Sequence, residues 1–375
     1  GRAPGRTLGT LVFAASCCVS LLLPAGNAVA DAAQTAPHDL VFQRVGDIEQ
    51  VPDGVVTSLA QTGDGLLWIG TTEGLVRHDG YRFRLFTHDP AKADSLPGNR
   101  IQQLLSDAQG RLWVGTYSNG VARFDAERER FLRFESRPGD PASLPEGTVR
   151  ALAQTPDGAI WVGTTGNGLG RIDPDGSVRR YRAAADDPLS LPDDRISALG
   201  VDAEGGLWVG SWQGLSRLRA GSQQFQRVLS DPEDPEGFAN TTIRGIHVAG
   251  NGDVWVGAQQ GQMARLPAAA LKNEGAPQAH QVQRWRGGGL NAALEPGDGS
   301  LWIAHARGID VYAADTTERL RELRHRAVDP LSLANAEVRD LQGDGAGGIW
   351  IGTFGGGLQR ANARANAVSA RRFDP

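Results

Sequence analysis

The sequence predicts an all-β fold, a seven-bladed β-propeller of four-stranded antiparallel blades. A Trp-Val-Gly-like pattern returns seven times, its tryptophans stand 45 to 48 residues apart, and helical periodicity is absent after the first thirty residues. A fixed period of about 20 to 50 residues is typical of stacked supersecondary units. Short β-rich runs between glycine turns are typical of antiparallel meanders. The motif tryptophans are Trp68, Trp113, Trp161, Trp208, Trp255, Trp302 and Trp350.

Each period shows the same elements in the same order. A first strand is expected around an aliphatic residue twelve positions before the tryptophan. An Asp, Asn or Gly turn leads into the second strand, which carries the Leu-Trp-Val-Gly-Thr pattern, and a second glycine turn leads into the third strand. The fourth strand is the last apolar run of the period. The aliphatic residues of the first strands are Val56, Ile101, Val149, Ile196, Ile243, Leu290 and Val338.

The recurrent residues have structural explanations. A tryptophan is large and flat enough to fill the wedge between neighbouring blades, and the glycine two residues later leaves room for a close approach. The sixth period has Ala304 at that glycine position, which makes it the most degenerate blade. An arginine recurs on the expected third strand, and we expect it to form hydrogen bonds between blades. These arginines are Arg77, Arg123, Arg171, Arg217, Arg265 and Arg360.

Proline-rich connections join the periods. The phrase Asp-Pro-x-Ser-Leu-Pro, or a close variant of it, predicts ordered crossovers from the outer strand of one blade to the inner strand of the next. It ends the sequence as well, at Asp374-Pro375, from which we expect further repeats in the parent protein. The aspartates that open the phrase elsewhere are Asp94, Asp140, Asp187 and Asp329.

Two apolar runs compete to close the ring. Residues 40–45 precede the first period, residues 368–373 follow the last, and both resemble the outer strand of a blade. Propellers often pair an outer strand from one terminus with strands from the other, which removes an exposed sheet edge. We expect Phe42 to join the seventh blade, with 368–373 as the alternative.

The first thirty residues resemble a secretory signal peptide. Arg2 and Arg6 give a basic region, residues 8–23 an apolar region, and Ala28-Val-Ala30 a small-residue cleavage site. The apolar run of about sixteen residues is short for a membrane span, so cleavage is favoured over a membrane anchor. We therefore expect a signal peptide at 1–30, a propeller over 40–375 and a periplasmic mature chain.

Composition and charge argue against several classes of partner and of active site. The formal net charge of −5 argues against nucleic acid and against anionic membrane surfaces. Both cysteines, Cys17 and Cys18, lie in the signal segment, so the mature chain relies on its apolar core in place of disulfides. The histidines show no metal-ligand spacing, and the sequence indicates no cofactor. The expected funnel loops supply one carboxylate, Glu73, where acid–base hydrolysis usually needs two, so we expect no catalytic residues in this segment.

The candidate functional residues lie where the repeats differ. In a propeller the loops between second and third strands and the beginnings of the inner strands share one face, around a central funnel. Polar groups, aromatic rings and three guanidinium groups would meet there, which suits a polar or anionic ligand such as a sugar acid. The candidates for the funnel mouth are Glu73, Gln102, Tyr117, Asn119, Arg150, Asn167, Trp212, Gln213, Arg244, Gln259, His305, Arg307, Arg339 and Phe354.

The three arginines at the beginnings of the inner strands allow a second interpretation. Arg150, Arg244 and Arg339 could instead pair with neighbouring carboxylates such as Glu146 or Glu337, which would make them structural. The sequence alone leaves both interpretations open.

Several phrases resemble the two-component regulator propeller repeat. They are the Asp-Pro-x-Ser-Leu-Pro connection, Asp64-Gly-Leu-Leu-Trp-Ile-Gly-Thr-Thr-Glu-Gly-Leu75 and His78-Asp-Gly-Tyr-Arg-Phe83, and the resemblance covers roughly residues 40–375. It implies a membrane-bound receptor with a periplasmic part of two propellers and a small β-sandwich, then a transmembrane helix. The implied cytoplasmic output resembles a histidine kinase, often hybrid, or a diguanylate cyclase with a GGDEF motif. The ligands that the resemblance implies are mostly oligosaccharides.

The expected function is a periplasmic ligand-binding sensor domain that biases a dimeric signalling output across the membrane. The first alternative is a free periplasmic carbohydrate-binding or scaffold propeller. The second is a propeller polysaccharide lyase or glycosidase, since one fold hosts many functions. A transmembrane segment and a kinase or cyclase motif downstream would separate the sensor from the free propeller.

Overall fold

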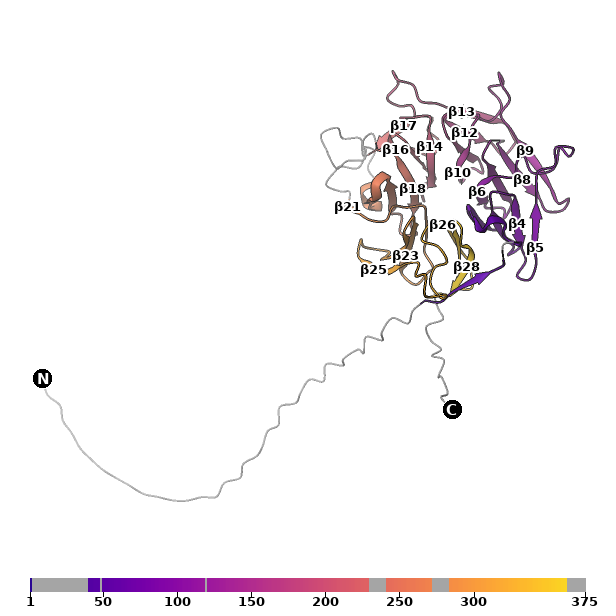
Figure 1. Cartoon of the computed structure of the whole chain (residues 1–375). Coiled ribbons are helices and arrows are strands. Elements are labelled where there is room, and N and C mark those ends of the chain that lie inside the picture. Colours follow the sequence, from indigo (N-terminus) through magenta and orange to yellow (C-terminus); the bar gives the residue numbers. More distant parts are fainter. Residues whose placement is uncertain (2–39, 48, 119, 229–240, 272–282, 363–375) are drawn as a thin grey trace, which may run out of the picture. The chain divides into compact units, whose positions relative to one another are not determined.

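Seven four-stranded antiparallel sheets make up the described part of the chain, as the sequence predicts. Within each sheet the strands follow one another in sequence, except that the seventh sheet recruits β1 from the beginning of the described chain. The inner strands of neighbouring sheets contact one another all the way round, the last and the first included. Figure 1 shows these sheets as blades around a common centre in the computed structural model.

The strands of the first four blades run from the inner edge outward in chain order. Blade one contains β2 (Ser58–Gln61), β3 (Leu67–Gly70), β4 (Leu75–His78) and β5 (Phe83–Phe86). Blade two contains β6 (Ile101–Ser106), β7 (Leu112–Thr116), β8 (Val121–Asp125) and β9 (Arg130–Phe134). Blade three contains β10 (Val149–Gln154), β11 (Ile160–Thr164), β12 (Leu169–Ile172) and β13 (Val178–Tyr181). Blade four contains β14 (Ile196–Val201), β15 (Leu207–Ser211), β16 (Gly214–Leu218) and β17 (Phe225–Val228).

The remaining blades follow the same order. Blade five contains β18 (Ile243–Val248), β19 (Val254–Ala258), β20 (Gln262–Leu266) and β21 (Gln283–Arg286). Blade six contains β22 (Ala292–Leu294), β23 (Ser300–His305), β24 (Gly308–Ala313) and β25 (Arg319–Leu323). Blade seven contains β26 (Val338–Gly343), β27 (Gly348–Thr353), β28 (Gly357–Asn362) and β1 (Phe42–Val45). The described helical segments are η1 (Pro52–Gly54), η2 (Gln259–Gly261) and α1 (Ala268–Leu271).

The structure describes residue 1 and residues 40–47, 49–118, 120–228, 241–271 and 283–362. The propeller belongs to the unit Leu40–Pro375, which is distinct from the unit Gly1–Asp39. Apart from Gly1, the expected signal peptide lies outside the described residues, and so does the alternative closing run at 368–373. Signal cleavage and the domain boundaries therefore stay predictions.

β1 closes the ring. Its residues pair antiparallel with β28, Phe42 opposite Ala361 and Val45 opposite Leu358. The strand thereby takes the outermost place in the seventh sheet, and the Phe42 side chain is buried in an apolar cluster with Trp302. The prediction that Phe42 joins the seventh blade is confirmed.

A glycine of one blade receives an aliphatic side chain of the next. A methyl group added at Gly163 would stand 2.7 Å from Cγ2 of Ile196, and one added at Gly115 would stand 2.5 Å from Cγ1 of Val149. These distances are far inside van der Waals contact, so the missing side chain is what lets the blades approach. The equivalent pairs are Gly70–Ile101, Gly210–Ile243, Gly257–Leu290 and Gly352–Val56. One contact therefore explains two recurrent positions of the repeat.

Each motif tryptophan packs at one junction between blades. Trp161 of blade three lies in a cluster with Leu207 and Val209 of blade four. Its indole N–H is satisfied inside its own blade, where Nε1 donates to Thr155 Oγ1 at 3.0 Å. Seven apolar clusters contain one motif tryptophan each, with Trp350 partly buried at the last junction. The predicted wedge-filling role is confirmed.

The recurrent arginine of the third strand mostly acts within its own blade. Arg171 stacks over Trp161 with its guanidinium carbon 5.3 Å from the ring centroid, and it pairs with Asp157 at 2.7 Å. The same pairing recurs as Arg217–Asp202, Arg265–Asp253 and Arg360–Asp344. The expectation of bonds between blades holds for Arg77, which reaches Glu129 of blade two, and for Arg217, which also donates to Leu271 O of blade five at 3.2 Å. It is wrong as a general rule, because an acidic turn of the same blade lies within reach.

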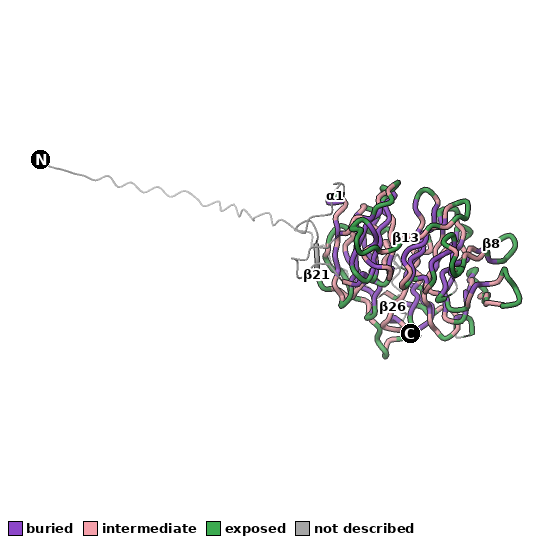
Figure 2. The backbone as a smooth tube through the Cα atoms, turned by 90° about the horizontal axis from the view of Figure 1, so that it is seen from above, coloured by how far each residue is buried: buried purple, intermediate pink, exposed green. Residues whose placement is uncertain are grey.

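The proline-rich crossovers are held by hydrogen bonds at both ends. In the connection from blade two to blade three, Ser143 Oγ accepts from Arg137 N at 2.8 Å and donates to Asp140 O at 2.9 Å. Arg180 of the next outer strand then donates to Ser143 O at 2.6 Å and to Leu144 O at 2.8 Å. In Figure 2 the buried residues follow the strands, and the exposed ones follow the turns and crossovers.

Gly163→Ala should destabilise the propeller by about 1–3 kcal/mol, the usual cost of overpacking a filled core, because its methyl group meets Ile196. Gly343→Ala is the matched control, since a methyl group there stands 3.7 Å from Leu294 and makes an ordinary contact. Urea denaturation of both variants measures the difference in free energy of unfolding. Equal midpoints for the two variants would contradict the role of the close approach.

Candidate functional site

One residue leaves the strand ladder at the beginning of most inner strands. In five blades the pairing of the first and second strands shifts by one residue directly after the opening aliphatic residue. Such an extra residue is a β-bulge, which frees its side chain from the ladder and bends the strand. The bulged residues are Gln102, Arg150, Ser197, Arg244 and Arg339, and Thr57 and Asn291 hold the same position in the other two blades.

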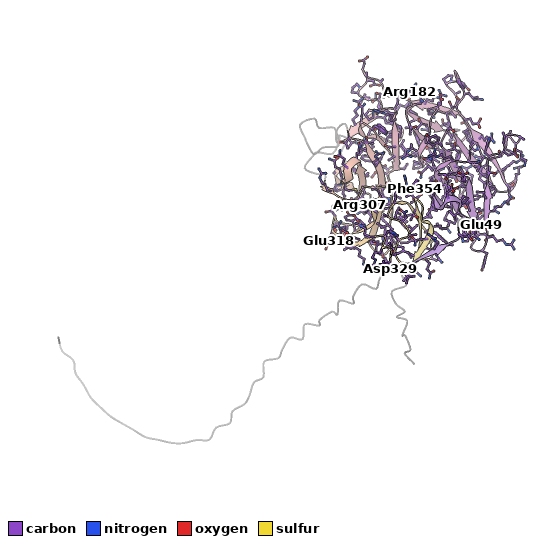
Figure 3. The ribbon with its side chains drawn as sticks, viewed as in Figure 1. Glu49, Arg182, Arg307, Glu318, Asp329 and Phe354 are labelled. Atoms are coloured by element: carbon purple, nitrogen blue, oxygen red, sulfur yellow. The ribbon has the colours of Figure 1, made fainter. Side chains whose placement is uncertain are left out.

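All seven of these side chains line one cavity, which we call the funnel. It has a volume of about 470 Å³, and its wall is formed by the inner strands. Tyr117 and Phe354, which directly follow the second strands of blades two and seven, also line it. Figure 3 shows Phe354 toward the middle of the ring, whereas Arg182, Glu318 and Asp329 lie toward its outside.

Arginines give the funnel a positive charge. Desolvation and the neighbouring guanidiniums of Arg339 and Arg244 lower the pKa of Arg150, so these cations are close enough to repel one another. Arg150 donates to Gln102 Oε1 at 3.2 Å, and Arg339 pairs with Glu337 Oε1 at 2.6 Å. Within the described residues Arg150 and Arg244 have no carboxylate partner. The alternative of carboxylate pairing is therefore confirmed for Arg339 and wrong, in this part of the chain, for the other two.

The aromatic rings of the funnel each carry a guanidinium on one face. The guanidinium carbon of Arg100 stands 4.3 Å from the centroid of Tyr117, and that of Arg339 stands 4.8 Å from the centroid of Phe354. Both rings keep nearly half of their surface exposed. A guanidinium that stacks on a ring keeps its N–H donors in its own plane, where they can reach a ligand.

Asp340 is the one carboxylate among the described funnel residues, and it is engaged at the junction of blades seven and one. Its Oδ2 accepts from Ser58 Oγ at 2.9 Å and from Leu59 N at 2.7 Å, and its Oδ1 accepts from Leu341 N at 2.8 Å. Ser58 Oγ in turn accepts from Leu104 N of blade two at 3.1 Å. Burial raises the pKa of Asp340 to about 6, against the lowering effect of its hydrogen bonds.

Three buried polar atoms of the funnel residues have no hydrogen-bond partner within the described chain. They are Thr57 Oγ1, His247 Nε2 and Arg339 Nε. Desolvation lowers the pKa of His247, with Glu295 acting in the opposite direction, which favours the neutral imidazole. A buried polar group left unsatisfied costs about 1–3 kcal/mol, so each of these atoms lowers the stability of the ring.

The structure brings together six of the predicted residues and separates others. The six that line the funnel are Gln102, Tyr117, Arg150, Arg244, Arg339 and Phe354. The predicted residues that do not line it are Glu73, Asn167, Trp212, Gln213, Gln259, His305 and Arg307. Trp212 is exposed elsewhere and carries Arg195 on its ring at 4.6 Å. Asn119 lies outside the described residues.

Local packing explains two of these corrections. His305 is buried, and a methyl group at Gly288 would stand 2.3 Å from its ring, so the blade-five crossover covers the imidazole. Its Nδ1 accepts from Arg307 N at 3.1 Å, which makes it a loop-capping residue. Asn167 is likewise engaged, since its Nδ2 donates to Glu146 O at 3.0 Å.

Sequence reasoning missed three chemically distinctive funnel residues. Arg100 stands just before the opening aliphatic residue of β6, and His247 lies deeper in β18. Asp340 stands directly after a bulge, where blades one and two have Ser58 and Gln103. Comparing the seven inner strands position by position would have found His247 and Asp340, because each departs from the residue type of the other periods. Arg100 would not have stood out, because blade four has Arg195 at the same position.

The described residues contain no group of three or more His, Cys, Asp or Glu side chains that could hold a metal ion. Among those same residues, no helix has both the length and the apolar character needed to cross a membrane.

Comparison with known proteins shows which family the repeats match and which solved structures have a similar fold. Residues 50–73, 95–118, 143–166 and 190–213 match the family described as Two component regulator propeller. The extracellular domain of the hybrid two component system BT3049 from B. thetaiotaomicron is similar, with a TM-score of 0.71 and 25% identity over 86% of this chain and 42% of that chain. The corresponding domain of BT4673 from the same organism has a TM-score of 0.67 and 21% identity, over 86% and 40% of the two chains. No curated protein matches the sequence.

A streptogramin B lyase structure shares the fold, with a TM-score of 0.62 and 13% identity over 86% of this chain and 97% of that chain. At this identity, and at the 21% of BT4673, the likeness shows the fold alone. The chain spans 42% of the length of the BT3049 domain. The expected resemblance to the two-component regulator propeller is confirmed by the four matching segments.

Asp340→Asn should flatten the pH dependence of stability between about pH 4 and pH 6. Because the pKa of Asp340 is raised from 3.8 to about 6, the folded protein binds more protons than the unfolded chain in this window. The free energy of unfolding contributed by this group therefore falls as the pH rises through the window. An asparagine does not ionise, so this contribution is absent from the variant.

Urea denaturation at about pH 4.5 and about pH 6.5 measures the change for the parent chain and for Asp340→Asn, with the exposed Asp315→Asn as the control. An equal change in the parent chain and in Asp340→Asn would show that burial does not raise this pKa.

Proposed function

We propose that this chain, four of whose repeats match the two-component regulator propeller, is the periplasmic ligand-binding sensor domain of a transmembrane signalling receptor. The funnel is the observation that carries the proposal. The blades share most of their packing residues, but the side chains that line the funnel differ from blade to blade. Such a gathering of unlike polar groups in one concave site is typical of ligand binding.

The ligand that suits the funnel best is a polar molecule such as an oligosaccharide. A volume of about 470 Å³ lies within the usual range of small-molecule sites, roughly 300–1,000 Å³. The guanidinium groups of Arg150 and Arg244 can donate hydrogen bonds to a hydroxylated ligand, and Tyr117 and Phe354 offer exposed ring surface to its carbon skeleton.

The receptor architecture extends beyond this chain. The similar domains of BT3049 and BT4673 are extracellular parts of hybrid two component systems, and the chain spans less than half of either. Further propeller repeats, a transmembrane segment, and a histidine kinase or diguanylate cyclase output acting as a homodimer therefore belong to the proposal. Export would use the signal peptide at 1–30, and ligand occupancy would shift the balance between two states of the receptor.

We expect binding without turnover in this segment. Glycoside hydrolysis usually needs two carboxyl groups about 5–10 Å apart, and the described funnel residues offer Asp340, whose oxygens are occupied by three hydrogen bonds. Because a streptogramin B lyase has the same fold, turnover assays on glycans are the direct check.

The site is tested by isothermal titration of the chain with a panel of plant and microbial oligosaccharides. For any binder, Tyr117→Ala combined with Phe354→Ala should weaken binding by about 10-fold to 100-fold, because aromatic anchors dominate such sites. Tyr81→Ala is the matched control, since this tyrosine is 94% exposed on the turn between β4 and β5. Circular dichroism of the variants verifies that the fold is kept.

Three outcomes would contradict the proposal. Unchanged affinity in the double variant would place the ligand outside the funnel, and cleavage of any glycan in the panel would replace the sensor with an enzyme. Loss of affinity in Tyr81→Ala alone would likewise move the site to the opposite face.

A further inference from the structure

The wall of the funnel differs between its two sides. Directly after the seven funnel side chains stand Ser58, Gln103 and Asp340 in blades one, two and seven. Blades three to six have small residues there, which are Ala151, Ala198, Gly245 and Ala292. On the first side, side chains cover the next backbone amides, since Leu59 N donates to Asp340 and Leu104 N donates to Ser58. On the other side, a methyl group or a hydrogen atom takes their place.

Strand register directs the corresponding amides of blades three to five toward the funnel. Thr155 N donates to Ala159 O at the turn of blade three, so the alternation of an antiparallel ladder makes Leu152 and Val162 a non-hydrogen-bonded pair. The N–H and C=O groups of Leu152 therefore point away from β11, toward the funnel that this residue lines. The same register holds for Leu199 in β14 and Ile246 in β18.

Guanidinium groups stand next to these amides. Arg150 and Arg244 are the bulged residues two positions before Leu152 and Ile246, and no carboxylate pairs with either within the described chain. Arg339 has a carboxylate partner for one nitrogen only, and its buried Nε has no hydrogen-bond partner. The described lining contains four arginines against one carboxylate, although the whole chain carries a net charge of −5. The funnel is therefore positively charged although the chain as a whole is negatively charged.

We propose that the funnel takes a ligand carrying an anionic group, a carboxylate or a sulfate, which Arg150 and Arg244 bind directly. The inference rests on the proposed ligand site and adds the charge of the ligand to it. Guanidiniums bind carboxylates and sulfates through paired charge-assisted hydrogen bonds, and an anion between them offsets their mutual repulsion. Backbone N–H and C=O groups side by side suit hydroxyl groups, which favours an acidic sugar over a bare ion.

The experiment compares three probes on the same chain by isothermal titration. They are trigalacturonic acid, its fully methyl-esterified form, and sodium sulfate. The acidic trimer should bind at least about tenfold more tightly than the neutral ester, and its advantage should shrink as sodium chloride is raised, because exposed charge pairs are screened. Sulfate that competes with the trimer shows recognition of the anion itself, whereas no competition shows that the sugar must carry it.

Arg150→Gln combined with Arg244→Gln should abolish the advantage of the acid over the ester. Arg128→Gln combined with Arg179→Gln is the matched control, since it removes the same charge near the turns between third and fourth strands. The funnel variant should keep or raise the melting temperature of the parent chain, because it removes two cations that repel each other. A fall in affinity is then assigned to the ligand contact and not to unfolding.

The inference is overturned if the ester binds as tightly as the acid, or if the funnel double variant keeps the preference for the acid. It is also overturned if neither the acid nor sulfate binds at millimolar concentration. A neutral ester whose binding still depends on Tyr117 and Phe354 would leave the proposed funnel site intact and remove only its charge preference.

Discussion

The contact between a glycine of one blade and an aliphatic side chain of the next determines how closely the inner strands approach. Where Gly163 meets Ile196, no other residue type leaves the inner strand of blade four its present position. Repeated round the ring, this spacing positions the tryptophan wedges, lets β1 meet β28, and leaves a funnel of the observed size on the axis. The sixth junction has Ala304 packed with Val338 and shows that one methyl group can be accommodated where the neighbouring blade allows it.

Scaffold and site are separated within a few residues of the same strand. In β10, Val149 packs against Gly115 of the preceding blade, Arg150 bulges toward the funnel, and Leu152 presents its backbone there. Packing therefore fixes the residues on either side of the bulge, while the bulged Arg150 lines the funnel and donates to Gln102 of the preceding blade. The funnel can therefore be rich in arginine although the whole chain carries a net charge of −5, since the contact with Gly115 depends on Val149 and not on Arg150.

Much of the fold follows from the sequence because its causes are local and repeated. The period, the glycine turns and the aliphatic residues twelve positions before each motif tryptophan all recur in register. A wrong strand assignment in one blade is therefore corrected by comparison with the other blades. The site is harder, because loop residues such as Trp212 and His305 share a topological place with Phe354 yet lie outside the funnel. Whether a loop side chain turns toward the axis depends on its neighbours, as the glycine crossover over His305 shows. The sequence correctly predicted Arg150 and Arg244 as funnel residues, because they lie in a strand and not in a loop, and the strand fixes the direction of their side chains toward the funnel.

The residues at the beginnings of the inner strands also bear on how a propeller of this kind diversifies. The residue at this position differs from blade to blade, although some of these side chains also bond to the next inner strand, as Ser197 Oγ does to Ile243 O and Asn291 Nδ2 does to Val338 O. Seven such positions, one per blade, let substitutions change the lining of the funnel one residue at a time, while the glycine contacts that set the spacing of the blades stay the same.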